Sequence, residues 1–299
     1  MRSVPSTDGL TLTLHHLADG RADRPDGRRA LFAHATGFHG SLWGPVARHL
    51  PQLDSWALDF RAHGDSVVPP GQDLSWDRYA DDVLAVADDL HLDQAVGIGH
   101  SMGGAALLMA EHRRPGTFGC LWLYEPVVFP PDILVALSAA RSGPNPMAAA
   151  ALRRRERFDS TDAALANYAA KPPLNVFTPE ALSAYVEFGF APAPDGSVAL
   201  KCRPADEAAT FEMTSRHLAW DSLPTVRCPV LVVRGRVEPN SPSRAAEAIV
   251  ARLANGHLEI HEALGHFGPM EDPPAMAASI SRFVERHPPR TGSAASCVD

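Results

Sequence analysis

A serine flanked by glycines is the part of this chain best suited to covalent chemistry. Residues 97–104 read Gly-Ile-Gly-His-Ser-Met-Gly-Gly, in which Gly99, Ser101 and Gly103 fill the pattern G-x-S-x-G. A short apolar strand is expected before this stretch, and residues 105–110 are apolar helix formers. A strand, a tight turn and a helix together place a serine hydroxyl at the tip of the turn, and the glycines keep side chains out of the crossing. The pattern therefore predicts a nucleophile elbow with Ser101 as the nucleophile.

A serine hydroxyl is a weak nucleophile near neutral pH, so it needs a base, and the base needs a carboxylate to orient it. The chain has 14 histidines. His266 is the best placed, because its loop follows the last expected strand (257–260) and precedes the last expected helix (about 272–287). His34 and His100 flank the site, and we expect them to bond backbone groups in tight loops.

Two glutamates compete to be the orienting carboxylate, which should lie between the serine and the histidine in chain order. Glu238 follows the expected strand 230–233 and is our first candidate. Glu125, which ends the expected strand 121–124, is the alternative. If Glu238 takes the role, Glu125 is expected to be a pocket-wall residue or a partner for a residue of the segment 126–223. Asp59 is expected to be structural, paired with Arg61.

A tetrahedral intermediate also needs two backbone N–H donors for its oxyanion. We expect these donors from Met102, directly after the nucleophile, and from Thr36, in the loop after the first central strand. Side chains predicted to contact the substrate are His100, Phe38, Glu125, Trp220 and Phe267. Further apolar residues that could line a pocket, although they equally suit a packed core, are Phe129, Met147, Phe177, Tyr185, Phe188, Phe190, Phe211, Met213 and Trp220.

Strand and helix patterns alternate along residues 1–125 and 224–290, which predicts an α/β core with a mostly parallel sheet and helices on both faces. Residues 126–223 are rich in alanine and proline, with helix-start signals at Asn145-Pro146 and Thr178-Pro179. This segment is expected to be a helical cap inserted between two strands. The arginine-rich run 153–157 is expected to be a solvated helix face, and residues 291–299 a loose tail. The candidate residues fall where strands end, which is where such sheets bind ligands.

Composition excludes several classes of function. The 299 residues are 45% apolar and 21% charged, as in soluble globular proteins, and the net charge of −8 disfavours nucleic acid or an anionic membrane as a partner. No apolar run is long enough to span a bilayer, and the first residues lack a signal-peptide pattern. The four cysteines show no metal-binding spacing. We therefore expect a cytoplasmic monomer or homodimer that acts on a small molecule and uses no metal or other cofactor.

Taken together, these motifs resemble the α/β-hydrolase superfamily over about residues 10–287. The resemblance rests on the histidine-led loop from His34, the stretch 59–66, the elbow, the inserted segment and Gly265-His266-Phe267. It implies an α/β-hydrolase fold and acyl-enzyme chemistry, in which His266 deprotonates Ser101 and then protonates the leaving group. A serine at the elbow differs from the aspartate of epoxide hydrolases and haloalkane dehalogenases. The loop 34–37 also lacks the H-G-G-G of hormone-sensitive-lipase-like esterases.

The first functional hypothesis is hydrolysis of a small or medium carboxylic ester or lactone. C–C bond hydrolysis and acyl transfer use the same residues and remain alternatives. A ligand-binding protein on an inactive hydrolase scaffold is a further alternative, against which the Ser101–His266 pair argues.

Overall fold

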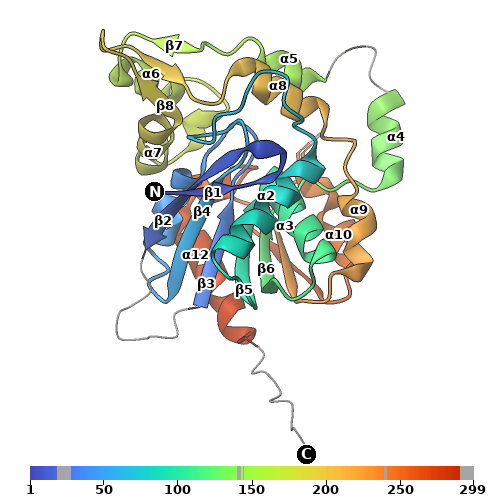
Figure 1. The fold of residues 1–299 in the computed structure, drawn as a ribbon. Helices are drawn as coiled ribbons and strands as arrows, with labels where there is room; N and C mark the ends of the chain where they lie inside the picture. Colours follow the sequence, from blue (N-terminus) through green and yellow to red (C-terminus); the bar gives the residue numbers. More distant parts are fainter. Residues whose placement is uncertain (19–27, 140–142, 144, 239–240, 290–299) are drawn as a thin grey trace, which may run out of the picture.

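The chain is built around an eight-stranded sheet (Figure 1). The structure is a computed structural model that describes residues 1–18, 28–139, 143, 145–238 and 241–289. In spatial order the strands are β1 (Arg2–Pro5), β2 (Thr11–Ala18), β4 (Leu53–Asp59), β3 (Arg28–Ala33), β5 (Ala95–His100), β6 (Phe118–Tyr124), β10 (Val230–Arg234) and β11 (Gly256–Ile260). The pairs β1–β2 and β2–β4 are antiparallel, and the other neighbours are parallel. The predicted α/β-hydrolase fold with a mostly parallel sheet is confirmed.

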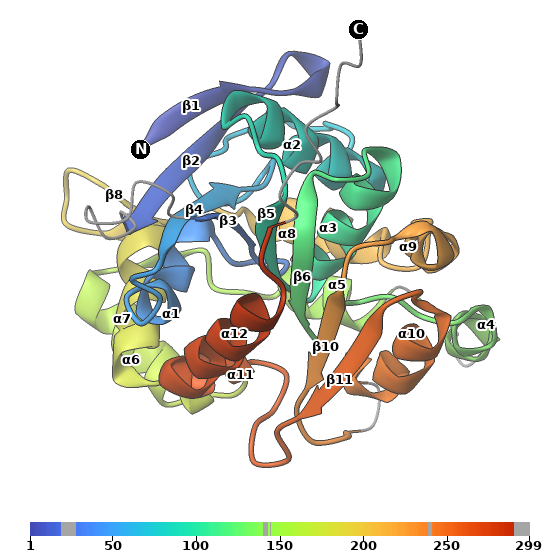
Figure 2. The same cartoon turned by 90° about the horizontal axis from the view of Figure 1, so that it is seen from below.

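Helices cover both faces of the sheet, as the alternation of buried residues along the strands requires. In β3, Leu31 and Ala33 pack with the helices of one face, and Ala30 and Phe32 pack with those of the other. The first face carries α2 (Trp76–Asp89), α3 (Met102–Arg113) and α10 (Ala246–Arg252). The second carries α1 (Gly44–Ala47) and α12 (Pro273–Arg286), as Figure 2 shows from below. The strands therefore end in one common edge with a helical layer on either side.

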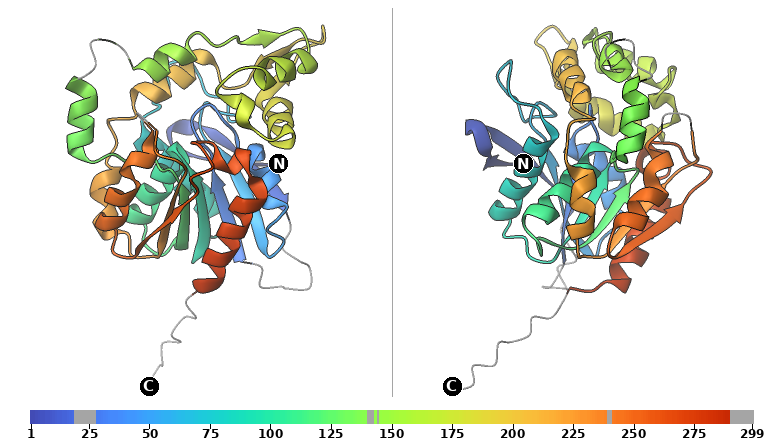
Figure 3. Two further views of the ribbon diagram at one scale, coloured as in Figure 1. Left: turned by 180° about the vertical axis from the view of Figure 1, so that it is seen from behind. Right: turned by 90° about the vertical axis from the view of Figure 1, so that its right-hand side faces the viewer.

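Residues 126–223, called here the insert, join β6 to β10. Its elements are α4 (Pro131–Ala139), α5 (Pro146–Ala151), β7 (Arg157–Phe158), α6 (Thr161–Ala169), α7 (Pro179–Gly189), β8 (Phe190–Pro192), β9 (Val198–Leu200), α8 (Pro204–Glu212) and α9 (Ala219–Ser222). Figures 1 and 3 show α5 to α8 lying over the end of the sheet. The expectation of an all-helical segment is wrong in one respect, because β7, β9 and β8 form a small antiparallel sheet.

The two ends of the chain segment just described behave differently. Ala219 of α9 and the nearby Leu223 pack into the core cluster that contains α3. The expected boundary at residue 223 therefore lies beyond the point where the chain rejoins the core. Short 3₁₀ turns at Thr7–Gly9, Gly40–Trp43, Leu174–Val176, Leu223–Thr225 and Pro242–Ala245 and the short helix α11 (Gly268–Glu271) complete the connections. The expected tail, residues 291–299, lies outside the described residues. Across the described parts of the chain, no helix is both long and apolar enough to cross a membrane.

The first turn of α3 packs directly on the end of β3, which makes Gly103 a strict requirement. A Cβ at this position would collide with the carbonyl oxygen of Ala33 and lie 2.7 Å from that of His34. Gly103→Ala should therefore lower the free energy of unfolding in urea by at least about 1–3 kcal/mol. Gly44→Ala is the matched control, because its added methyl group would meet no atom within 4 Å. Equal unfolding midpoints for the two variants would contradict this packing.

Candidate active site

Ser101 occupies the turn between β5 and α3, as predicted. Its φ of 56° is a left-handed conformation that a side-chain-bearing residue adopts only when its surroundings hold it there. Its N–H donates to the carbonyl oxygen of Tyr124 at 3.0 Å, which ties the turn to the end of β6. The hydroxyl makes no capping bond to α3 and lies 3.3 Å from Nε2 of His266. The serine oxygen is therefore directed at a potential base.

His266 lies in the loop between β11 and α11. Its Nδ1 is 2.7 Å from Oε2 of Glu125. Because a carboxylate can only accept, Nδ1 carries the ring proton and Nε2 is left as an acceptor for the hydroxyl of Ser101. The carbonyl oxygen of His266 accepts from Nε2 of His100 at 2.8 Å, which fixes the loop from the other side. The result is a continuous hydrogen-bonded chain from Ser101 through His266 to Glu125.

Glu125 is 1% exposed and is held by the loop that follows β10. Its own N–H donates to the carbonyl oxygen of Val233 at 2.8 Å. Its Oε1 accepts from the N–H of Gly235 at 2.9 Å, and its Oε2 accepts from the hydroxyl of Ser241 at 3.2 Å. A buried carboxylate needs such donors, since an unpaired charge in this environment is costly. The carboxylate that faces His266 is thus positioned before any substrate binds.

The first candidate for this position, Glu238, is wrong. Its side chain is 45% exposed, and Oε1 accepts from Nε of Arg236 at 2.6 Å. Glu238 lies four residues beyond the end of β10, on the outside of the loop, whereas Glu125 ends the strand next to β5. The loop predicted to supply the acid supplies hydrogen-bond donors to it instead.

Thr36 and Met102, the residues expected to donate backbone N–H groups, come from neighbouring segments. Met102 is the first residue of α3, where N–H groups have no partner within the helix. Thr36 lines the same cavity as Ser101, and its hydroxyl donates to Sδ of Met102 at 3.3 Å. Their side chains are therefore in contact, with the N-terminal end of α3 beside the serine. An oxyanion-binding role for their N–H groups remains a prediction.

The histidines that flank the serine are structural, as expected. Nδ1 of His34 donates to the carbonyl oxygen of Ala35 at 2.8 Å, and its Nε2 accepts from the N–H of Phe60. Burial lowers the pKa of His34 to about 3. Burial also lowers the pKa of His100 well below its usual range, which leaves a neutral ring that donates to the loop of His266. The prediction that His100 contacts substrate is wrong, since its fully buried ring does not line the cavity.

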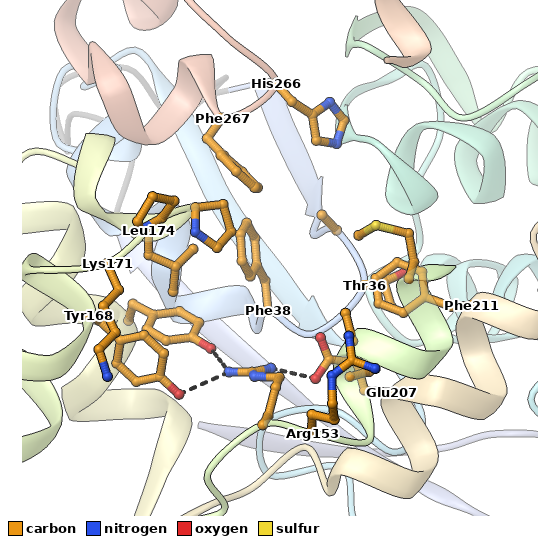
Figure 4. A pocket seen from close by; sticks show the side chains of 18 of the residues that line it. Thr36, Phe38, Arg153, Tyr168, Lys171, Leu174, Glu207, Phe211, His266 and Phe267 are labelled. Atoms are coloured by element: carbon orange, nitrogen blue, oxygen red, sulfur yellow. Dashed lines mark hydrogen bonds and ion pairs between the residues drawn. The ribbon is translucent and has the colours of Figure 1, made fainter. Parts of the chain in front are cut away.

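Ser101 and His266 open into a cavity of about 510 Å³ between the core and the insert. Phe38 and Phe267 line it, as predicted, and Figure 4 shows both rings pointing into it. Trp220 does not line it; this residue belongs to α9, and its indole ring packs under the guanidinium of Arg252. Glu125 does not reach the cavity either, because its carboxylate is used on His266. Met147, Tyr185 and Phe211 are the pocket-lining members of the larger apolar set.

The opposite wall is charged, which the sequence analysis missed. Arg153, Arg154 and Lys171 line the cavity together with Glu207 (Figure 4). The run 153–157 was expected to be a solvated helix face, but α5 ends at Ala151 and the run turns back over the cavity. Its only signal in the sequence is the concentration of four arginines within five residues of an acidic chain.

A separate cluster of polar residues is structural. Among the described residues, His15, Asp59 and Asp65 form a group whose potential ligand atoms lie within 4.8 Å of one another. Those atoms already have protein partners: Asp59 accepts from His15 at 2.9 Å, and Asp65 pairs with Lys201 at 2.7 Å. Asp59 does not pair with Arg61, contrary to expectation. The guanidinium of Arg61 bonds Asp82 and Asp8 instead.

Comparisons with known proteins agree with this architecture. The model of the Alpha/beta hydrolase family matches residues 30–279. The 3-oxoadipate enol-lactonase 2 of Acinetobacter baylyi is 25% identical over 278 residues, which cover 92% of this chain and 94% of that protein. The 2-(acetamidomethylene)succinate hydrolase of Mesorhizobium japonicum is 28% identical over 237 residues, with 77% and 78% covered. Lipase LipV of Mycobacterium tuberculosis is 32% identical, but the match spans only 33% of this chain and 38% of that protein.

A solved structure gives the same result for the fold. The crystal structure of E-2-(acetamidomethylene)succinate hydrolase superposes with a TM-score of 0.77 at 22% identity, covering 95% of this chain and 98% of that chain. The strand order, the elbow, the histidine loop and the family match over 250 residues lead to one conclusion. This chain belongs to the alpha/beta hydrolase family.

Proposed function

We propose that this chain is a serine hydrolase that cleaves a small or medium carboxylic ester or lactone through an acyl-enzyme on Ser101. The observation that carries the proposal is the hydrogen-bonded chain of Ser101, His266 and Glu125, which opens into a cavity under the insert. A nucleophile, a base and an orienting carboxylate in this order are the working parts of acyl transfer. The enclosed cavity fits a compact substrate better than an open lipid surface.

The proposed reaction has two steps. Nε2 of His266 takes the proton of Ser101 as Oγ attacks the carbonyl carbon, and the same nitrogen then protonates the departing alcohol oxygen. Water, deprotonated by Nε2, next attacks the acyl-enzyme, and the proton returns to Oγ of Ser101. Glu125 keeps the ring in the productive tautomer and stabilises the imidazolium. The N–H groups of Thr36 and Met102 are assigned to the oxyanion in both steps.

Labelling with a fluorophosphonate probe tests the nucleophile directly. We expect a single adduct on Ser101, located by mass spectrometry of the labelled peptide, because the phosphorus centre mimics the acyl carbon. Ser101→Ala and heat-denatured wild-type protein are the controls, and both should stay unlabelled. Folded wild-type protein that carries no adduct on Ser101 would overturn the mechanism.

The reaction type needs its own measurement. A panel of p-nitrophenyl esters and lactones should be hydrolysed, and lactones belong in it because one relative is named as an enol-lactonase. A β-diketone in the same panel tests C–C bond hydrolysis, and added alcohol acceptors test acyl transfer. Cleavage of the diketone alone, or a transfer product that exceeds the free acid, would replace the ester proposal by the corresponding alternative.

A further inference from the structure

The cavity carries an excess of positive charge that the hydrolytic chemistry does not use. Its lining includes four cationic side chains (Arg153, Arg154, Arg155 and Lys171) and one carboxylate, that of Glu207. The whole chain, by contrast, has a net charge of −8. A cavity that concentrates charge opposite in sign to the rest of the protein favours ligands of the complementary charge.

The ionic partners of these groups divide them into two kinds. Arg154 bonds Glu207 and is thereby neutralised within the wall. Arg155 stacks over the ring of Phe158 and lies 3.7 Å from a carboxylate of the insert surface. Arg153 and Lys171 have no carboxylate partner among the residues that the structure describes. Nζ of Lys171 donates only to the amide oxygen of Asn167, at 2.8 Å.

Two phenols add further donors on the same wall. Nη2 of Arg154 donates to the hydroxyl oxygens of Tyr168, at 3.2 Å, and Tyr185. Because guanidinium only donates, each phenol keeps its own proton for another acceptor. No described side chain or carbonyl accepts from either hydroxyl, although Tyr185 is 2% exposed. Burial also raises the pKa of Tyr185, so this hydroxyl stays protonated. A buried hydroxyl with an unused proton needs an acceptor atom in the cavity.

The arrangement of the lining fixes where that acceptor belongs. Figure 4 shows His266 at one side of the cavity and Arg153, Tyr168 and Lys171 at the other, with the ring of Phe38 between them. A substrate whose carbonyl is at Ser101 would therefore cross an apolar stretch before it reaches the charged wall. We infer that the substrate carries a carboxylate, separated by a short apolar spacer from the bond that is cleaved, and that Arg153, Lys171 and the phenols of Tyr168 and Tyr185 bind it. The nature of the cleaved bond in this inference rests on the proposed function.

Matched esters test the inference in the wild-type protein. The p-nitrophenyl monoester of adipic acid should be hydrolysed with a kcat/KM about 10- to 100-fold above that of p-nitrophenyl hexanoate, since a charge-assisted hydrogen bond contributes at this level. The 6-ammonium hexanoate ester should be a poorer substrate than the neutral ester. 4-Carboxyphenyl hexanoate, compared with phenyl hexanoate, asks whether the carboxylate belongs on the alcohol side. If neither carboxylate ester exceeds its neutral match, the inference is overturned.

Variants at the exposed cations locate the effect. Arg153→Gln and Lys171→Gln should each reduce the ratio of kcat/KM for the carboxylate ester to that for its neutral match by about 5- to 10-fold, mainly through KM. Arg216→Gln is the matched control, because it removes one positive charge from an exposed site of the insert outside the cavity. The control should leave the ratio unchanged. Ratios that fall equally in all three variants would exclude a local site.

A binding measurement separates this inference from the reaction itself. Adipate should bind the Ser101→Ala protein in calorimetric titration, with an affinity that falls as salt rises. Arg153→Gln in that background should weaken it by about tenfold, while 1,6-hexanediol should show no measurable binding. This result holds even if no adduct forms on Ser101, so failure of the proposed function would still leave the carboxylate site tested. No heat of binding for adipate at millimolar concentration would overturn the site.

Discussion

Glu125→Gln should lower kcat for a p-nitrophenyl ester by about 10⁴-fold, the size of effect seen when a triad carboxylate becomes an amide. The N–H of Gly235 requires an acceptor at the Oε1 position, so it would hold the amide oxygen of the new glutamine there. The amide NH₂ would then face Nδ1 of His266, where Oε2 now lies 2.7 Å away. The ring proton would move to Nε2, and this nitrogen could no longer accept the proton of Ser101.

Glu238→Gln is the matched control for this change. The two substitutions are chemically identical, but Glu238 is half-exposed and bonds only Arg236. We expect its kcat to stay within about twofold of wild type, because exposed ion pairs contribute little. Steady-state kinetics of both variants with one ester decides the assignment. A loss of several orders of magnitude in Glu238→Gln, with Glu125→Gln active, would mean that the loop after β10 rearranges when substrate binds.

The comparison of these two glutamates also marks the limit of what the sequence could predict. The elbow was predictable because its geometry is local: Gly99, Ser101 and Gly103 impose one turn between one strand and one helix. The acid is not a local property. Both glutamates follow a strand and precede the histidine, and only the path of the loop after β10 decides which carboxylate is buried against His266. The alternation of strand and helix patterns, in contrast, was enough to predict the sheet and its two helical layers.

The charged wall was out of reach for a similar reason. An arginine run in an acidic chain is usually a solvated surface, and nothing in residues 153–157 shows that the helix ends before them. The wall forms because Glu207, on another helix of the insert, and the phenols of Tyr168 and Tyr185 converge on Arg154. These contacts span up to 53 positions of the chain. Long-range pairings of this kind have no spacing rule that a single sequence could display.

Ser101→Ala and His266→Ala should each lower kcat by about 10⁶-fold, and the double variant should lose no more than either single one. The two side chains act in a single proton transfer across the 3.3 Å from Oγ to Nε2, so removal of either stops it. Both variants should fold. The N–H of residue 101 still donates to the carbonyl oxygen of Tyr124, and the loop is still held through the carbonyl of residue 266. Thermal melts provide the control for folding.

Non-additivity in this set is the strongest test of the mechanism. A residual rate of about 10³-fold over the uncatalysed reaction should persist in all three variants, from substrate binding and the backbone donors alone. If the losses multiplied instead, the serine and the histidine would be acting in separate steps. If His266→Ala lost only about tenfold while Ser101→Ala lost everything, another base would have to reach Oγ. Neither His34 nor His100 could take that role, because both rings are buried and hydrogen-bonded to backbone carbonyls.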